Sequence, residues 1–363
     1  MKQRCYLRIL LLANLQLALV FADSPQGFQK PGGQRPSSEQ VSQPQEQSNA
    51  IDRIWSDPGR VEKLDLAGGP GGKAGAPKPP FAFVKELKTG TSPKVEVTDS
   101  QNKTWVVKFG SEVNAEVFAT RIAWVVGYFV DATYFLPSGK IGGVTKLGRA
   151  KRFIGADGSF ADACLEFRDK NATRLKKNGW TWQNNPFVGT RELNGLKIVL
   201  MLTSNWDNKD ARNESSNTGI LQYSSKGGSE RRYLVTDWGA SMGRWGRIFK
   251  REKWDCEGFA EQTPGFIKGV KDGKIEWGYT GKHTSDTKED ITLGDVKWLL
   301  RYLSQLSDDQ IMMGLQASGA NTAETQCFTE AIRSRIDQMN RLVEGGPVSL
   351  EQSTSGLAIA ACR

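Results

Sequence analysis

Five polar residues in three short stretches of the sequence could act together on a phosphate group. Lys108 ends the run WVVK, Asp237 opens DWG, and the stretch SNWDNKDARN holds Asp207, Lys209 and Asn213. Phosphoryl transfer needs a lysine that steadies the nucleotide phosphates and an aspartate that positions the attacking hydroxyl. It also needs an asparagine and a second aspartate that hold magnesium ions. The chain offers these residue types in the required order, so the pattern predicts phosphoryl transfer.

The residues around Lys108 predict the elements that would position it. From Phe81, the runs FAFVKEL, KVEVTD and TWVVKFG are short and β-rich, and each is bounded by Gly, Ser or Asn. They predict an antiparallel meander whose third strand carries Lys108. The stretch SEVNAEVFATRIAWVVGY then predicts an amphipathic helix with Glu112 and Glu116 near its start. A further strand and turn are expected from Tyr134.

The second half of the chain is expected to be mostly helical. A buried helix is predicted from about Arg191 to Leu202, directly before the stretch that holds Asp207. The run RRYLVTDWG predicts a strand that ends in a turn at Asp237, and two strong amphipathic helices are expected near the C-terminus. The predicted class is α+β, with a small antiparallel β lobe that contains one helix and a larger helical lobe.

With these elements and residues, roughly residues 80–340 resemble the protein-kinase-like superfamily. Within it the sequence is similar to HipA-type kinases, phosphoinositide lipid kinases and secretory-pathway kinases, and it also resembles an uncharacterised group of exported bacterial proteins. The resemblance implies the two-lobed protein-kinase-like fold. It also implies binding of ATP and of Mg²⁺ or Mn²⁺, with phosphoryl transfer to an unknown protein or small-molecule acceptor.

The resemblance implies roles for single residues on the nucleotide side of the site. Lys108 would be the lysine of the third strand, and Glu116 would be its partner on the helix. The turn TGTSPK, with Gly90 and Lys94, would cover the phosphates. This turn has one glycine, where the usual covering loop has three.

The resemblance also implies roles on the acceptor and metal side. Asp207 would be the catalytic aspartate, and Lys209 would be the loop lysine that follows it. Asn213 and Asp237 would hold the metal ion. No His-Arg pair precedes Asp207, and Asn213 follows it by six residues, where the usual catalytic loop has five. These departures bear on substrate class and activity more than on fold.

Two other functions would use the same site. The presence of Asp207, Asn213 and Asp237 favours a working metal site and therefore a phosphotransferase. The turn with a single glycine, together with the export that is predicted below, favours a non-catalytic pseudokinase that keeps the fold as a binding module. Nucleotidyl transfer by the same residues is the third possibility.

The first 22 residues predict export of the chain. Three basic residues precede a short apolar run from Ile9 to Ala22, and Val20-Phe21-Ala22 offers a cleavage pattern before Asp23. We expect a signal peptide over 1–22 and an exported protein, either periplasmic or secreted. No later stretch is apolar enough over about 20 residues to span a membrane.

Composition divides the remaining chain. Residues 23–80 are rich in Gln, Pro, Ser and Gly and predict a disordered, low-complexity linker, within which 51–66 could dock on the domain. The β lobe is expected over 81–148 and the helical lobe over 149–345. The last residues, 346–363, are expected to form a flexible tail.

Charge and cysteine content narrow the function classes. The formal net charge is +9, and removal of residues 1–22 would leave +6. This mild excess suits anions such as nucleotides, but it is not the dense basic stripe of a nucleic-acid binder, so no nucleic-acid partner is expected. The single histidine, His283, argues against a zinc site or a Ser-His-Asp triad. Four cysteines would remain after cleavage and permit two disulfides in three connectivities: Cys164, Cys256, Cys327 and Cys362.

Overall fold

A computed structural model describes residues 50–175, 179–207, 217–246, 251–282 and 285–345 of the chain. All described elements belong to one compact unit, Ser48–Arg363. Two predicted site residues, Lys209 and Asn213, lie outside the described residues, as do the predicted signal peptide and the predicted tail. Within the described ranges, no helix combines the length and the apolar character that crossing a bilayer requires.

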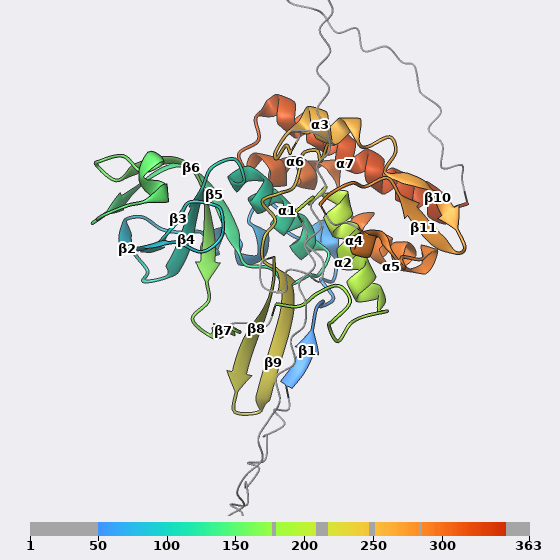
Figure 1. Cartoon of the computed structure of the whole chain (residues 1–363), viewed down its shortest axis with the longest axis horizontal. Coiled ribbons are helices and arrows are strands. Elements are labelled where there is room, and N and C mark those ends of the chain that lie inside the picture. The colour runs from blue at the N-terminus through green and yellow to red at the C-terminus, as the bar shows by residue number, and fades with distance from the viewer. Residues whose placement is uncertain (1–49, 176–178, 208–216, 247–250, 283–284, 346–363) are drawn as a thin grey trace, which may run out of the picture. The chain divides into compact units, whose positions relative to one another are not determined.

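Five strands close into a small barrel in the N-terminal part of this unit (Figure 1). Their order around the barrel is β2-β3-β4-β6-β5, and all neighbours are antiparallel except β2 and β5. The strands are β2 (Phe81–Leu87), β3 (Lys94–Thr98), β4 (Thr104–Phe109), β5 (Thr133–Gly142) and β6 (Ser159–Arg168). The meander predicted from the first three β-rich runs is therefore confirmed as β2, β3 and β4.

Alternation of residue types gives these strands two different faces. Val95 on β3 lies opposite Val107 on β4, which lies opposite Leu165 on β6, and all three are fully buried inside the barrel. Residues one position away point to the other face, because side chains alternate along a strand. That face carries a row of polar side chains across the same three strands, formed by Lys94, Lys108 and Cys164.

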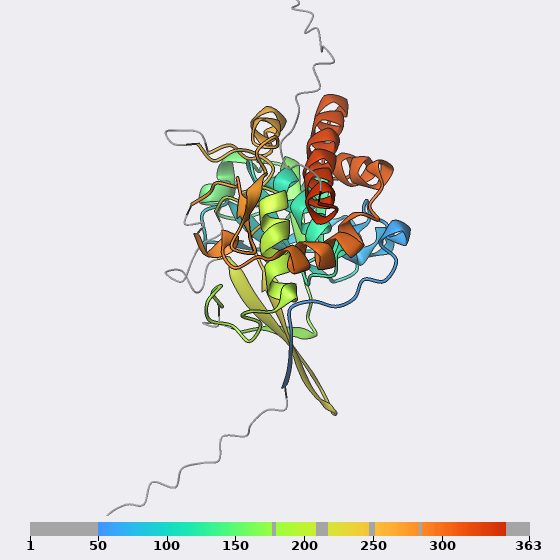
Figure 2. The same cartoon turned by 90° about the vertical axis from the view of Figure 1, so that its right-hand side faces the viewer.

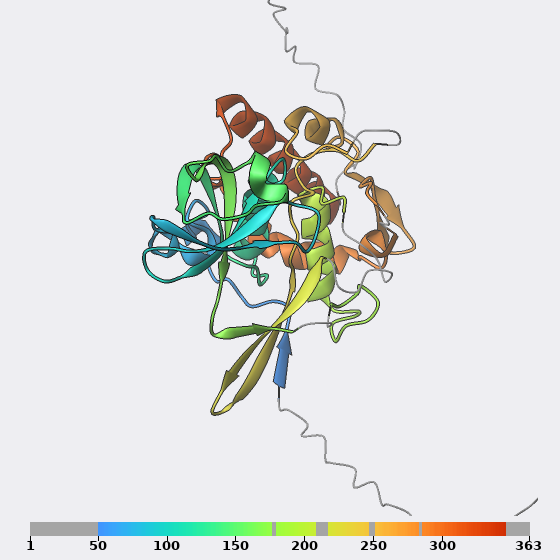
Figure 3. The same ribbon diagram turned by 60° about the vertical axis from the view of Figure 1, so that its left-hand side comes forward.

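Helix α1 (Val113–Val125) lies against this barrel and also contacts the helical part of the unit (Figure 3). The sequence predicts an amphipathic helix, but α1 is buried on almost every side. It packs on β5 and β6 as well as on the C-terminal helices, so it has no broad solvent face. Its buried Arg121 donates to the Gly314 carbonyl at 3.2 Å and to the Ser318 hydroxyl at 3.1 Å, which ties the two parts together.

The C-terminal part is mostly helical (Figure 2). Its helices are α2 (Arg191–Leu202), α3 (Cys256–Glu261), α4 (Ser285–Lys288), α5 (Leu293–Leu303), α6 (Asp308–Gln316) and α7 (Thr322–Val343). Capping boxes at Thr292, Ser307 and Asn321 begin α5, α6 and α7. Helix α5 contacts both α2 and α7, and α2 has the bounds that the sequence predicts.

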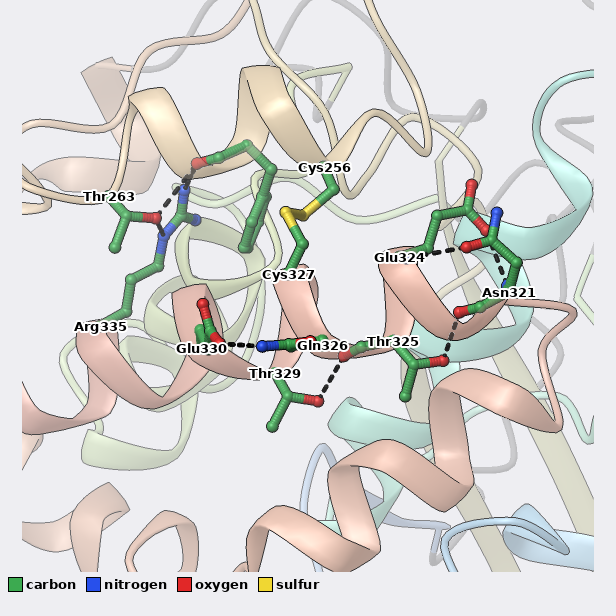
Figure 4. Close-up of a disulfide and its surroundings, with 11 residues drawn as sticks. Cys256, Thr263, Asn321, Glu324, Thr325, Gln326, Cys327, Thr329, Glu330 and Arg335 are labelled. Carbon is green, nitrogen blue, oxygen red and sulfur yellow. Dashed lines mark hydrogen bonds between the residues drawn. A yellow bond between two sulfur atoms is a disulfide. The ribbon is translucent and has the colours of Figure 1, made fainter. Parts of the chain in front are cut away.

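Two features fix α7 against its neighbours (Figure 4). A disulfide joins Cys256 of α3 to Cys327 of α7. Cys164 is free and buried, and Cys362 lies outside the described residues. The sequence permits two disulfides, and the described residues form one of them. Arg335 of α7 is 1% exposed and donates at 2.9 Å to the carbonyl of Leu202, the last residue of α2.

The remaining strands form two small sheets. One has the order β1-β9-β8-β7, with β1 parallel to β9, and the other is the hairpin of β10 and β11. Their bounds are β1 (Ala50–Arg53), β7 (Ala172–Arg174), β8 (Thr218–Ser225), β9 (Gly228–Val235), β10 (Ile267–Lys271) and β11 (Lys274–Trp277). Strand β9 leads to Asp237, as the sequence predicts.

The glycine-rich stretch before the barrel differs from its prediction. Composition predicts a linker up to residue 80, but the chain from residue 50 packs on the domain through short 3₁₀ turns: η1 (Val61–Lys63), η2 (Gly69–Gly71) and η3 (Lys73–Gly75). Leu66 is fully buried, and the Tyr134 hydroxyl donates to the Gly72 carbonyl at 2.9 Å. A Cβ at Gly71 would lie 2.0 Å from that hydroxyl. The glycines therefore allow a close backbone approach rather than a flexible link.

The described unit thus combines an antiparallel barrel and one helix with a larger helical part. This arrangement confirms the predicted α+β class, with a small antiparallel β part and one helix followed by a larger helical part. The lobe boundary predicted at residues 148 and 149 is too early. The 3₁₀ turn η4 (Arg149–Arg152) follows it, and β6 (Ser159–Arg168) then completes the barrel, because a strand can pair with β4 and β5 without being next to them in sequence.

Candidate functional site

A cavity of about 390 Å³ lies beside the turn between β2 and β3 and brings five predicted site residues together. The rest of its lining comes from the turn itself, from Glu112 just before α1, from β6 and β7, and from Thr236 just after β9. The predicted residues in it are Gly90, Lys94, Lys108, Glu116 and Asp237. The charged lining is balanced, with four cations and four carboxylates: Lys94, Lys108, Arg168, Arg174, Glu112, Glu116, Glu166 and Asp237.

Lys108 stands at the centre of a buried charge cluster. Its ammonium group contacts the carboxylate of Glu116 on α1, which is the partner that the sequence predicts. It also lies 2.7 Å from Glu166 on the neighbouring strand β6, which the sequence analysis does not identify. Both carboxylate side chains are only 4% exposed, so the ion pairs are shielded from water. The local signal for Glu166 is a single acidic residue inside the apolar run ACLEF.

The two carboxylates that contact Lys108 differ in pKa and therefore in how much negative charge each one carries. Burial alone would raise the pKa of Glu166, but Lys108, Arg168 and Arg174 bring that pKa down to about 2. Burial raises the pKa of Glu116 to about 7, because Lys108 only partly offsets it and the charge of Glu166 adds to it. At neutral pH, Glu166 is therefore the carboxylate that stays fully ionised beside Lys108.

The turn over the cavity is fixed from two sides. Gly90 has a φ of +69°, a left-handed conformation that favours glycine. A Cβ at Gly90 would lie 3.3 Å from the Lys94 ammonium, so this cation lies close to the turn. On the outer side, Arg149 donates at 2.7 Å to the Gly90 carbonyl. On the cavity side, the Ser92 hydroxyl donates to Glu112, the residue that precedes α1.

Glu112 extends this contact to the C-terminal part of the unit. It forms an ion pair with Lys253, which lies in the segment that follows the Asp-Trp-Gly triplet. The Lys253 ammonium also lies 5.4 Å from the ring centroid of Trp206, the neighbour of Asp207. Sequence reasoning gives Glu112 no role and does not single out Ser92, because their contacts join segments far apart in the chain.

Asp237 lies two residues after the end of β9 and lines the cavity. One of its carboxylate oxygens accepts from the Gly239 amide at 3.1 Å, and Asn205 donates to its carbonyl at the same distance. Burial raises the pKa of Asp237, Lys108 lowers it, and the charges of Glu112 and Asp207 raise it further. A cation bound beside this carboxylate would stabilise its ionised form and lower its pKa.

Asp207 lies outside the lining of this cavity, although its charge acts on Asp237. Its Oδ1 atom is buried and accepts no hydrogen bond from the described residues, and the nearest ion-pair partner is Lys282 at 3.7 Å. As far as the described residues go, this oxygen can accept a hydrogen bond from a hydroxyl or bind a cation.

The donor chemistry of Asp207 and Asp237 suits a hard divalent cation, since Mg²⁺ and Mn²⁺ prefer carboxylate oxygens. The described residues contain no group of three or more His, Cys, Asp or Glu side chains arranged to hold a metal. One or two carboxylates with substrate phosphates are the usual protein contribution to a magnesium site. The residues present therefore fit a cation that is held jointly with phosphate.

Comparison with known proteins finds solved structures of a Golgi casein kinase. One, the crystal structure with Mn/ADP bound, is 11% identical over 78% of this chain and 75% of that chain, with a TM-score of 0.40. Another crystal structure of the Golgi casein kinase is 12% identical over 78% of this chain and 74% of that chain, also with a TM-score of 0.40. No family model and no curated protein matches the chain. Likeness at this level assigns no function to the chain.

Proposed function

We propose that this chain binds ATP together with Mg²⁺ or Mn²⁺ and transfers a phosphoryl group to a hydroxyl of a protein or small-molecule acceptor. The observation that carries the proposal is the buried ion pair of Lys108 with Glu116 in the cavity that Asp237 lines. A lysine of the third strand paired with a helix glutamate is the arrangement that protein kinases use to orient nucleotide phosphates.

In this proposal, each of these residues has a separate role in binding. Lys108 binds phosphate oxygens and is oriented by its two carboxylates, while Lys94 and the Gly90 turn close over the phosphates. Asp237 holds the divalent cation, with Asn213 assigned to the same task from the sequence. When bound, ATP supplies the γ-phosphoryl group and the cation neutralises charge on its oxygens.

Asp207 orients the acceptor and takes its proton in this scheme. The acceptor oxygen forms a bond to the γ-phosphorus, the bond between that phosphorus and the bridging oxygen breaks, and ADP leaves with the bridging oxygen. The hydroxyl proton passes to the Asp207 carboxylate and from there to solvent. Lys209, two residues further along, is assigned from the sequence as the loop lysine beside the transferred group.

Two aspartate variants separate binding from chemistry. Asp237→Asn should abolish metal-dependent ATP binding, measured by calorimetry on the purified chain, without lowering the melting temperature of the ligand-free protein. Asp207→Asn should still bind ATP, but transfer of labelled γ-phosphate should fall by about 10²–10⁴-fold. Asp272→Asn, in the exposed turn between β10 and β11, is the matched control and should change neither quantity.

Three results would decide between the functions that share the site. ATP binding by the wild-type chain without any transfer, and without an effect of Asp207→Asn on binding, would support a non-catalytic binding module. Release of pyrophosphate with labelling from α-phosphate would support nucleotidyl transfer. Absence of nucleotide binding with either metal would refute the proposal.

We also propose that the protein works outside the cytosol. The disulfide between Cys256 and Cys327 supports this, because stable disulfides belong mainly to oxidising compartments. Mass spectrometry of the native protein should find a mature N-terminus near Asp23. An intact N-terminal Met1 on a cytosolic protein with reduced cysteines would contradict the proposal.

A further inference from the structure

The sheet face that borders the cavity carries polar side chains almost throughout. On β3, β4 and β6, three cross-strand rows share this face, and the row nearest the turn is Lys94–Lys108–Cys164. The next row is Glu96–Val106–Glu166. The last row pairs two threonines with Arg168. Residues directly opposite one another on paired strands point to the same side of the sheet.

These three rows offer little apolar surface for a nucleobase. Val106 is their only aliphatic residue, and it is fully buried between two glutamates. On the neighbouring strands Leu87 lies opposite Lys94 and Phe135 lies opposite Cys164, but neither side chain lines the cavity. Charged groups, hydroxyl residues and Gly90 are all that the described chain contributes to the cavity lining.

The adjoining cavity, of about 300 Å³, does not supply the missing surface. It shares Arg168 and Arg174 with the first cavity, and its described apolar lining is limited to Ala172 and Leu221. Sites that select a flat base usually enclose it between hydrophobic and aromatic side chains. Stacking of a base on an aromatic ring contributes about 1–3 kcal/mol, and no ring lines either cavity among the described residues.

The same lining is well suited to a chain of phosphates. Lys94 forms no ion pair among the described residues, and it lies close to the Gly90 turn. Arg168 and Arg174 are each engaged by a carboxylate, Glu166 at 2.5 Å and Asp131 at 2.6 Å. A guanidinium has five N–H donors, so both arginines keep donors for phosphate oxygens.

We infer that the cavity recognises the polyphosphate chain of its phosphoryl donor and does not discriminate among nucleobases. The inference rests on the proposed function and names its donor class: any metal-bound nucleoside triphosphate, and inorganic tripolyphosphate as the shortest ligand with the same recognition elements. The cations and hydroxyl groups contact phosphate, and the base projects without a pocket of its own.

The test compares ligands on the purified full-length chain by calorimetry in the presence of Mg²⁺ and of Mn²⁺. ATP, GTP, CTP and UTP should bind with dissociation constants that agree within about threefold, and tripolyphosphate should bind within about tenfold of ATP. Adenosine should not bind measurably. Preference for ATP over the other nucleotides by tenfold or more, or binding of adenosine alone, would overturn the inference and leave the proposed function intact.

A variant tests the role of Lys94 in the same assay. Lys94→Gln should weaken all four nucleotides and tripolyphosphate by the same factor, about tenfold, because the lost contact is to phosphate. Lys271→Gln, on the exposed strand β10, is the matched control and should bind like the wild type. A loss confined to ATP would overturn the inference. If Lys94→Gln does not fold, the wild-type comparison still decides. If no ligand binds the wild type, the inference and the proposed function both fail.

Discussion

Replacing the two carboxylates beside Lys108 one at a time should reveal which of them carries its counter-charge. Glu166→Gln and Glu116→Gln each remove one negative charge and keep nearly the same shape. The structure places both side chains at equal exposure and both in contact with Lys108. A simple count of ion pairs therefore predicts equal losses of stability, whereas the surrounding charges predict unequal ones.

The pKa shift of Glu166 sets the loss of stability that we expect when this residue is replaced. Its pKa falls from an ordinary 4.5 to about 2, so its ionised form is favoured in the folded state by roughly 3 kcal/mol, at 1.36 kcal/mol per pH unit. Loss of that charge also lets Glu116 ionise more readily beside Lys108, which offsets part of the cost. We expect Glu166→Gln to lower the free energy of unfolding by about 2–3 kcal/mol at pH 7.

Glu116 should behave in the opposite way, because its pKa is raised to about 7. A carboxyl group whose folded pKa is raised contributes most to stability below its unfolded pKa of 4.5, and this contribution is lost as pH rises toward 7. Gln resembles the protonated form, so Glu116→Gln should match the wild type near pH 4.5 and be at least as stable at pH 7.

Urea unfolding at pH 5 and at pH 7 measures these differences directly. Glu276→Gln, an exposed residue on β11, is the control and should change the free energy of unfolding by no more than about 0.5 kcal/mol. If Glu116→Gln costs as much as Glu166→Gln at pH 7, then both carboxylates are ionised beside Lys108 and the unequal division of charge is wrong.

Three further predictions concern other parts of the fold. Reduction of the Cys256–Cys327 disulfide, which spans 71 residues, should lower the free energy of unfolding by up to about 4 kcal/mol, and an unchanged melting temperature would contradict this. Cys164 is buried and burial raises its pKa, so peptide mapping should find it unalkylated in the native chain and labelled in denaturant; rapid native labelling would show that the site opens. Gly239→Ala would bring a Cβ within 2.8 Å of the Glu112 Cβ, so it should destabilise the chain by about 1–3 kcal/mol, and a neutral result would mean that α1 shifts freely.

The sequence predicts four of the five barrel strands because their signals are local, but it misses β6 and the closure of the barrel. It also predicts two helices near the C-terminus, where the chain forms three, α5, α6 and α7. The strands β2, β3 and β4 follow from β-rich runs between turn residues, and α2 follows from the apolar positions between Leu193 and Leu202. The glycine-rich stretch before the barrel was predicted less well, since composition cannot show that Gly71 lies against a tyrosine from β5.

The candidate site shows the same division between local and distant information. Lys108, Glu116 and Asp237 could be proposed from residue type, order and element, and they line one cavity. Glu166 could not, because its role depends on the register of β4 with β6, which no local pattern fixes. The contact of Ser92 with Glu112 likewise joins residues whose separation in sequence hides their proximity.

The position of Asp207 depends on a residue far from it in the chain. Arg335 is buried and pairs with no carboxylate among the described residues, and burial lowers its pKa to about 9. Its guanidinium donates to the Met201 and Leu202 carbonyls at the end of α2 and, at 2.8 Å, to the Ser204 hydroxyl. The final carbonyls of a helix lack partners within the helix, so a cation there satisfies them and also suits the negative end of the helix dipole. The geometry of the loop that presents Asp207 is therefore set by α7, which the disulfide holds in place from the other side.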